Sequence, residues 1–252
     1  MNRSSDRWLA YFLFLPVAAA VLAFVLGPTW DVATLSLTQF VMGQERGFGT
    51  LVNFRALWAD PVFGTVVVNT TIWILGGTVF CVLTGLAVGA YLAIDSKVTT
   101  ALRALILLPW VLPDVVTAMA WKWMLHGQVG VIGDAFTRTG ITDQPISFLG
   151  DPDLVMWMLV IVLVWRKMPL VALILCAAIR SVPAEQLEAA RMDGANAFQR
   201  FRHVILPNIS FSLTAVTLIS MIRINAEFNL PLVMTGVGPA NSSQIMSTYI
   251  YQ

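Results

Sequence analysis

Residues 185–207 read EQLEAARMDGANAFQRFRHVILP, and this charged stretch lies between two long apolar segments. Just before it stand Ser181, which can cap a helix, and Pro183, which is tolerated in a first turn. Glu185 and Glu188 would then face the positive end of the helix dipole. The stretch is therefore predicted to begin as a helix that connects two membrane spans.

One face of this predicted helix is apolar, because Leu187, Ala190, Gly194 and Phe198 recur at helical spacing. A glycine costs about 1 kcal/mol in an unbroken helix, so a break or a close approach is expected at Gly194. Periodicity alone leaves two interpretations open, a helix lying on lipid headgroups or a helix docked on a partner protein. The paired acids, the small residues and the lack of lysine favour docking.

Composition places the chain in a lipid environment. Hydrophobic residues make up 58% of the chain and charged residues 12%, with a net charge of +1, whereas a soluble domain carries about a quarter charged residues. The mean hydropathy is +0.77. Because only helices and closed barrels satisfy their backbone in lipid, long apolar runs predict an all-α, polytopic membrane helical bundle. Cys81 and Cys176 lie in apolar runs and are interpreted as buried hydrophobic residues.

Five apolar segments are long enough to cross a hydrocarbon core of roughly 30 Å as helices. The predicted spans are residues 8–28, 61–94, 101–125, 154–179 and 205–233, and residues 245–252 look like the start of a sixth whose remainder is missing. A cleaved signal peptide is the rival interpretation of the first span, but its apolar stretch is too long. Residues 29–60 read as a loop with a short surface helix. We expect one transmembrane domain, 1–252, with a core of 61–252.

Two details of the spans bear on packing. Pro109 and Pro113 predict a kink in the third span. Gly85 and Gly89 form a G-x-x-x-G pattern in the second span, which suits close helix packing.

Loop charges predict the orientation. The N-terminus, the turn at 95–103 and the loop at 180–203 hold eight of the fifteen Lys and Arg residues. The alternate loops are longer and carry seven acidic residues with few basic ones. By the positive-inside rule, the N-terminus and the loop at 180–204 are cytoplasmic.

The sequence carries no recognisable catalytic constellation. His126 and His203 lie far apart, and neither an H-E-x-x-H nor a G-x-S-x-G motif occurs. Lys97, Lys122 and Lys167 do not follow glycine, so no P-loop exists. We expect no catalytic site, metal or cofactor on this chain, and uphill transport would need energy from a partner or an ion gradient.

The charged stretch resembles the cytoplasmic signature loop of binding-protein-dependent ABC importer permeases. That family shows Glu-Ala-Ala, three residues, Gly, nine residues and then Ile-x-Leu-Pro. Here Glu188-Ala189-Ala190 is followed by Asp193-Gly194 and by Val204-x-Leu206-Pro207, so the spacing is kept and only Val204 departs.

Other short motifs are similar to the carbohydrate-uptake branch of that family, the maltose and glycerol phosphate type. They are Asn53-Phe54, Asn69-Thr70, Trp165 with Pro169, and Phe228-Asn229 leading to Thr235-Gly236. Val237 stands where the family has glycine, and the family's final span is absent after Gln252.

The resemblance implies a permease subunit in the bacterial plasma (inner) membrane. Its partners would be a second, homologous permease, two ATPase subunits that bind ATP and Mg²⁺, an extracytoplasmic solute-binding protein and membrane lipid, with no nucleic acid. The signature loop would form two short helices around Gly194. Glu188 would make a charged contact, Ala189 and Ala190 would permit close approach, and Leu206 and Pro207 would anchor the loop.

Charges inside the spans are candidates for the solute pathway, because they are costly in hydrocarbon. Arg223 and Glu227 are four residues apart and would neutralise one another on one helix face. Arg166 and Lys167 interrupt the fourth span and would face either the partner permease or the pathway. The predicted cavity is bordered by Trp165, Arg166, Arg223, Glu227 and Asn229. The alternative function is an ion-coupled secondary transporter that uses Arg223 and Glu227 as a relay, and a membrane enzyme ranks third.

Overall fold

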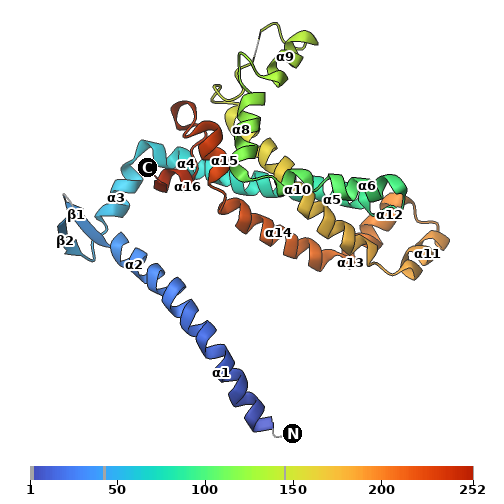
Figure 1. Ribbon diagram of the computed structural model, residues 1–252, viewed down its shortest axis with the longest axis horizontal. Coiled ribbons are helices and arrows are strands. Elements are labelled where there is room, and N and C mark those ends of the chain that lie inside the picture. Colours follow the sequence, from blue (N-terminus) through green and yellow to red (C-terminus); the bar gives the residue numbers. More distant parts are fainter. Residues whose placement is uncertain (1–2, 42–43, 145, 252) are drawn as a thin grey trace. The chain divides into compact units, whose positions relative to one another are not determined.

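The computed structural model describes residues 3–41, 44–144 and 146–251, and most of them are helical (Figure 1). Internal contacts divide the chain into two compact units, Met1–Gly64 and Thr65–Gln252. The boundary lies close to residue 61, where the predicted core begins.

The first unit starts with one long helical rod. It consists of α1 (Arg3–Val21), a π-helical turn η1 (Leu22–Leu26) and α2 (Gly27–Ser36). The membrane-compatible segment is Tyr11–Ser36, so it continues eight residues beyond the predicted end at residue 28. The prediction stopped too early because Pro28 lies in the first turn of α2, where its missing N–H removes no helical hydrogen bond.

Residues 29–60 contain more structure than the predicted loop. After α2, strands β1 (Thr38–Val41) and β2 (Gln44–Phe48) pair as an antiparallel hairpin, followed by the surface helix α3 (Val52–Ala59). The Asn53 amide donates hydrogen bonds to the carbonyls of Ser36 (3.0 Å) and Thr38 (2.9 Å), which fixes α3 against the hairpin. Such short, polar strands give too little alternation for sequence prediction.

The second span and the helices after it form the larger unit. They are α4 (Pro61–Thr71), η2 (Ile72–Gly76), α5 (Gly77–Leu92), α6 (Lys97–Leu105), α7 (Leu108–Val111), α8 (Asp114–Met124), α9 (Val131–Arg138), α10 (Val155–Arg180), α11 (Ala184–Met192), α12 (Ala197–Arg200), η3 (Phe201–Ile205), α13 (Leu206–Asn208), α14 (Ser210–Asn225), α15 (Asn229–Thr235), η4 (Pro239–Asn241) and α16 (Met246–Tyr251). The last helix agrees with the helical start expected after residue 245.

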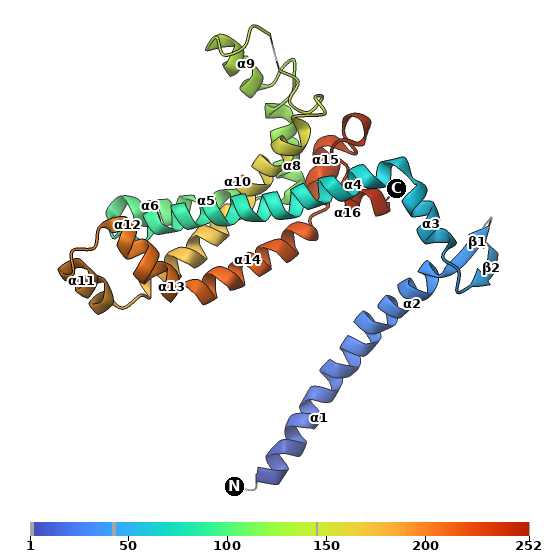
Figure 2. The same cartoon turned by 180° about the vertical axis from the view of Figure 1, so that it is seen from behind.

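The central contact of this unit is α5 packed along α10, as Figures 1 and 2 show from opposite sides. A Cβ atom on Gly85 would lie 2.6 Å from the Val171 side chain, and one on Gly89 would lie 2.7 Å from the Ala172 carbonyl oxygen. The G-x-x-x-G pattern therefore marks a real close approach of two helices. A buried core including Trp73, Leu159, Leu163, Ile224 and Leu230 continues from this contact.

Three of the predicted spans correspond to single long helices, and the other two correspond to bent helix pairs. Tyr11–Ser36, Pro61–Leu92 and Val155–Arg180 are each long and apolar enough to cross a membrane. The third predicted span is a pair, Lys97–Val111 and Asp114–Met124, bent by 93°. The fifth is also a pair, Ala197–Asn208 and Ser210–Asn225, bent by 72°. The predicted all-α membrane bundle is thus confirmed, with up to five spans.

The two ends of the larger unit carry different elements. Helices α6, α11, α12 and α13 lie at one end, whereas α8, α9 and α15 lie toward the other (Figures 1 and 2). This places the 95–103 turn and the 180–204 loop on one side, which agrees with the orientation inferred from loop charges.

Candidate functional site

Four charged side chains form a mid-membrane ion cluster: Asp114, Arg166, Lys167 and Glu227. Arg166 and Lys167 are neighbours on α10, and Glu227 follows α14, with its side chain only 4% exposed. Glu227 Oε2 lies 2.5 Å from Lys167 Nζ and 3.5 Å from Arg166 Nη1. Arg166 Nη2 also pairs with Asp114 Oδ1. The two cations and two carboxylates balance in charge.

Helix breaks bring these carboxylates to α10. Leu112 is extended (ψ 138°) because the following Pro113 disfavours a helical conformation, so α7 ends there and α8 restarts at Asp114. Asp114 thus lies in the first turn of α8, where the helix dipole favours a negative charge. Glu227 lies in a second break, between the end of α14 at Asn225 and the start of α15 at Asn229.

The depth of the cluster is consistent with a solute pathway. Arg166 precedes Arg180, at the predicted cytoplasmic end of α10, by fourteen residues, which corresponds to about 21 Å along the helix. That position lies well inside a hydrocarbon core of roughly 30 Å. Transport proteins commonly place solute and ion sites where membrane helices are discontinuous.

Several sequence predictions about this site need correction. Arg223 and Glu227 do not form the expected pair on one helix face, because α14 ends between them and Glu227 turns to α10. The fourth span is continuous through Arg166 and Lys167, although Pro169 lies inside it.

The other predicted cavity residues, Trp165 and Asn229, lie outside the ion cluster. Trp165 packs edge-to-face on Trp121, with ring centroids 5.4 Å apart. Asn229 is an exposed residue at the start of α15, and its side chain makes no hydrogen bond within the described part of the chain. The predicted set omitted Asp114 and Lys167. The sequence did hold a signal for each of them: Asp114 is an acidic residue beside a proline within a span, and Lys167 is a lysine within a span.

Gly194 ends α11 in a Schellman motif. Its φ of +80° is the left-handed conformation that glycine adopts without penalty. The Gly194 N–H donates to the Arg191 carbonyl (3.0 Å) and the Ala195 N–H donates to the Ala190 carbonyl (2.9 Å), which is the hydrogen-bond pattern of this cap. The expectation of two short helices around Gly194, α11 and α12, is therefore confirmed.

The second half of this coupling loop, defined as residues 180–204, is capped locally. Asn196 and Gln199 form a reciprocal capping box at the start of α12 (2.8 and 2.9 Å). Beyond the loop, Asn208 donates to the Gln186 side chain (2.8 Å), which connects α13 back to α11. Ser181 does not cap α11 as predicted, because its hydroxyl donates backward to the Ala178 carbonyl at the end of α10 (2.7 Å).

The coupling loop presents an apolar and charged outer surface. Glu188, Ala189, Asp193 and Pro207 are exposed, and Ala190 and Leu206 are half-buried. Met192 is 89% exposed and Phe198 is 70% exposed. Exposed Met and Phe side chains beside a carboxylate are typical of a protein-binding surface.

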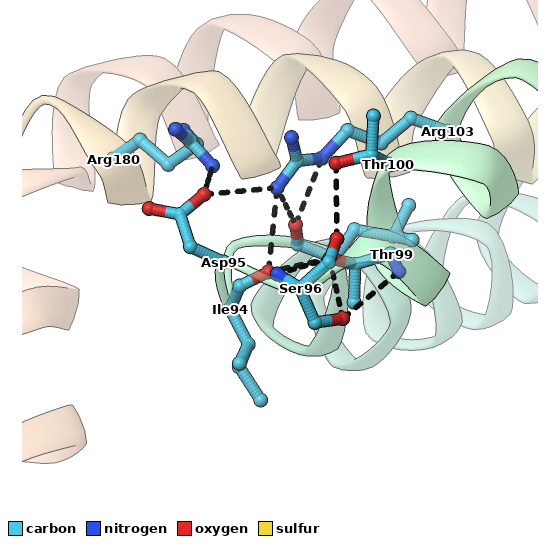
Figure 3. Close-up of polar contacts among 8 residues, drawn as sticks. Ile94, Asp95, Ser96, Thr99, Thr100, Arg103 and Arg180 are labelled. Atoms are coloured by element: carbon cyan, nitrogen blue, oxygen red, sulfur yellow. Dashed lines mark hydrogen bonds and ion pairs between the residues drawn. The ribbon is translucent and has the colours of Figure 1, made fainter.

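An ionic contact joins the end of α10 to the turn after α5. Figure 3 shows the Arg180 guanidinium directed at Asp95, with Nη1 2.5 Å from Oδ1. Arg103 lies 3.6 Å from the same carboxylate and donates to the Leu92 carbonyl at the end of α5. The hydrogen bond from Arg180 lowers the pKa of Asp95, so the contact stays ionised near neutral pH. It fixes the segment from which the coupling loop emerges.

A third polar contact holds the loop after α15. The Asn69 amide donates to the carbonyls of Asn241 (3.3 Å), Ser242 (3.0 Å) and Gln244 (3.1 Å). The Thr70 hydroxyl accepts from the Met246 N–H (2.9 Å). The Asn69-Thr70 motif singled out in the sequence therefore has a structural role on the second span.

Comparison with known proteins identifies related sequences. Residues 81–252 match the family described as "Binding-protein-dependent transport system inner membrane component". The chain is 29% identical to the trehalose/maltose transport system permease protein MalF of Thermococcus litoralis, with 95% of this chain and 81% of that protein covered. It is 27% identical to the sulfoquinovosyl glycerol transport system permease protein SmoG of Agrobacterium fabrum, with 98% and 80% covered.

A solved structure shares the fold. It is the bacterial alginate ABC transporter in complex with alginate pentasaccharide-bound periplasmic protein. The TM-score is 0.79 at 21% identity, and the match covers 98% of this chain and 83% of that chain.

Proposed function

The chain belongs to the family of binding-protein-dependent transport system inner membrane components, and from this we propose that it is the permease subunit of an ATP-driven importer for a sugar or sugar-like polar solute. The related permeases named for trehalose/maltose and sulfoquinovosyl glycerol support a sugar. The solute crosses beside the mid-membrane ion cluster by alternating access.

The coupling loop is the observation that carries this proposal. Two short helices joined by the Schellman turn at Gly194 present Glu188, Met192 and Phe198 outward. The loop holds three acids (Glu185, Glu188, Asp193) and four arginines (Arg180, Arg191, Arg200, Arg202), of which Arg180 is paired with Asp95 outside the loop. An anionic lipid surface selects helices with excess positive charge, so this balanced surface fits a protein partner better.

The proposed complex supplies what this chain lacks. Two cytoplasmic ATPase subunits bind ATP and Mg²⁺ and receive α11, with Glu188 as the charged contact and Ala189 and Ala190 permitting close approach. A second, homologous permease completes the pathway, and an extracytoplasmic solute-binding protein delivers the solute. The complex resides in a bacterial inner membrane. Leu206 and Pro207 anchor the loop at the bend before α14.

Two variants in the whole complex test the coupling. Glu188→Lys reverses the contact charge, and Gly194→Pro forbids the positive φ, so both are expected to abolish most solute uptake while expression persists. Asp134→Lys, on the exposed helix α9 away from the coupling loop, is the charge-reversal control and is expected to leave uptake unchanged. Full uptake by both loop variants would contradict the proposal.

The energy source separates this function from ion-coupled transport. Uptake that stops when the ATPase is inhibited and persists with ionophores supports the importer. The structure gives the ion relay little support, because Glu227 contacts Lys167 and Arg166 instead of the proposed relay partner Arg223.

A further inference from the structure

A second polar feature of the larger unit is a pocket between the end of α8, the loop at 147–150 and the loop after α15, at the end opposite the coupling loop (Figures 1 and 2). Its volume is about 570 Å³, within the range of small-molecule sites, roughly 300–1,000 Å³. We call it the outer pocket. Its polar lining consists of Lys122, His126, Gln128, Ser147 and Thr235, and aliphatic side chains complete it.

Hydrogen-bond donors are well represented in this lining. The Lys122 ammonium has three N–H groups, and the Val233 carbonyl accepts from Nζ at 3.2 Å. His126 Nδ1 accepts from the backbone N–H groups of Gln128 (3.2 Å) and Val129 (3.4 Å), so the neutral ring carries its proton on Nε2 as a donor. No carboxylate stands among the described residues of the lining. The pocket therefore suits a solute rich in oxygen acceptors and offers no counter-charge to a cation.

The wall formed by the loop after α15 is built in one fixed conformation. Gly238 has a φ of +68°, and a Cβ atom at this position would overlap the Ser243 side chain. The hydroxyls of Ser243 and Thr235 are hydrogen-bonded at 2.8 Å, and the three bonds from Asn69 hold the end of the same loop. A site whose walls are ordered in advance binds without paying to order them.

Two packed helices connect the outer pocket to the mid-membrane ion cluster. Helix α8 begins at Asp114 and ends just before the pocket, and α15 begins two residues after Glu227 and ends at Thr235 in the pocket wall. The two helices pack together, and the bond from Lys122 to Val233 joins them. The eleven residues of α8 correspond to about 16 Å along the helix. The helices that position the carboxylates of the cluster thus also form the outer pocket.

We propose that the outer pocket is an entry subsite in which a sugar rests before it reaches the mid-membrane ion cluster. Lys122 and His126 donate hydrogen bonds to the sugar oxygens, and the aliphatic lining contacts its C–H groups. A subsite on a transport path must bind well enough to be filled and weakly enough to be emptied, and a few hydrogen bonds in an open pocket meet that requirement. This inference rests on the proposed function and adds a second solute position to it.

Protection of a thiol from labelling tests where the sugar binds. Gln128→Cys places a thiol in the outer pocket and keeps the backbone N–H that bonds to His126, whereas Gln144→Cys places one on an exposed loop residue outside the lining. The purified complex of permeases and ATPase subunits reacts with a maleimide in the presence of maltose, trehalose, glucose, xylose or sorbitol. The sugar that the complex transports should slow labelling of Gln128→Cys about sixfold at about five times its Kd, because about one sixth of the pockets then remain free. Labelling of Gln144→Cys should be unchanged.

Variants assign the binding to Lys122. In the Gln128→Cys background, Lys122→Gln should raise the sugar concentration that gives half-protection about tenfold, because a charged donor is lost. Lys122→Arg keeps the charge and should retain most of the affinity, which separates loss of the donor from a folding defect. Lys97→Gln, at an exposed lysine at the start of α6, is the matched control and should leave half-protection unchanged.

Transport separates this inference from the proposed function. A sugar that is taken up with ATP but does not protect Gln128→Cys, or protects Gln144→Cys equally, would overturn the entry subsite and leave the importer intact. Half-protection that is the same in Lys122→Gln as in its parent would also overturn it. Failure of the wild-type complex to take up any of the five compounds with ATP would instead contradict the proposed function.

Discussion

Glu227 is the residue on which the mid-membrane ion cluster depends, because its nearly buried carboxylate contacts both cations of the cluster, Arg166 and Lys167. Glu227→Gln would leave Lys167 and Arg166 with only Asp114 as a counter-charge. Removing one partner of a buried ion pair costs about 3–5 kcal/mol, so we expect a large fall in thermal stability of the purified complex and little uptake.

A second substitution checks that the loss comes from unpaired charge. Lys167→Met combined with Glu227→Gln should recover part of the stability, whereas Asp134→Asn at the exposed pair with Arg138 should change it by less than about 1 kcal/mol. A double variant no more stable than Glu227→Gln would show that the charge balance is unimportant.

Gly194 offers a graded test of the coupling loop. Gly194→Ala keeps the side chain small but places an L-residue at φ +80°, at a cost of about 1 kcal/mol or more. We expect weaker association with the ATPase subunits, measured by co-purification. Gly64→Ala is the matched control, because Gly64 lies inside a helix with open space around it.

At the residue scale, local chemistry was predictable and long-range pairing was not. Gly194 was recognised as a break because glycine is unfavourable in an unbroken helix. The partners of Glu227 were missed because they depend on where α14 ends and on a residue sixty positions away on α10. Ser181 was misassigned because its hydroxyl can serve either the helix before it or the helix after it.

At the scale of helices, the close contact between α5 and α10 predicts that Gly89 and Gly76 differ in how well they tolerate replacement by alanine. Gly89→Ala would place a methyl group 2.7 Å from the backbone oxygen of Ala172, which cannot move aside cheaply, and should cost about 1–3 kcal/mol. Gly76→Ala meets only the Ile72 side chain at 3.9 Å and should be tolerated. Thermal unfolding of the two purified variants provides the comparison, and equal stability would contradict the close packing.

The strength of the contact between Asp95 and Arg180 is predicted to depend on salt concentration and not on pH near neutrality. Because the folded-state pKa of Asp95 is lowered, its contribution is present above the ordinary value of 3.8 and is lost only as pH falls through the lower, folded value. The carboxylate is 79% exposed, so salt should screen the contact.

We expect Asp95→Asn to raise the number of ATP molecules hydrolysed per solute imported, because the root of the coupling loop is held less firmly. The increase should be similar between about pH 5 and pH 8, and added salt should narrow the difference between the variant and the wild type. If the variant at low salt hydrolyses the same number of ATP molecules per imported solute as the wild type, Asp95 does not hold the root of the coupling loop in this way.

Composition and length predicted the helical elements well, since apolar runs identify spans. The 93° and 72° bends were beyond prediction, because hydropathy does not report direction. Pro109 and Pro113 indicate that the third span is irregular, but they do not predict that it restarts as a separate helix at Asp114.

At the scale of the whole molecule, the predicted orientation can be measured with single cysteines. Cys81 and Cys176 are buried, so a membrane-impermeant maleimide should react with them slowly. Met192→Cys should react only from the cytoplasmic side and Arg138→Cys only from the opposite side, which can be compared in intact cells and inverted vesicles. Labelling of both positions from one side would contradict the positive-inside assignment.

The shared contacts of Glu227 also determine how α10 can turn about its own axis. Consecutive residues of a helix project about 100° apart, and yet one carboxylate oxygen lies 2.5 Å from Lys167 Nζ and 3.5 Å from Arg166 Nη1. A rotation of α10 in either direction must lengthen one of these distances as it shortens the other. The ratio of the two distances therefore reports the rotational angle of the helix, and structures of different transport states can be ordered by which nitrogen is nearer.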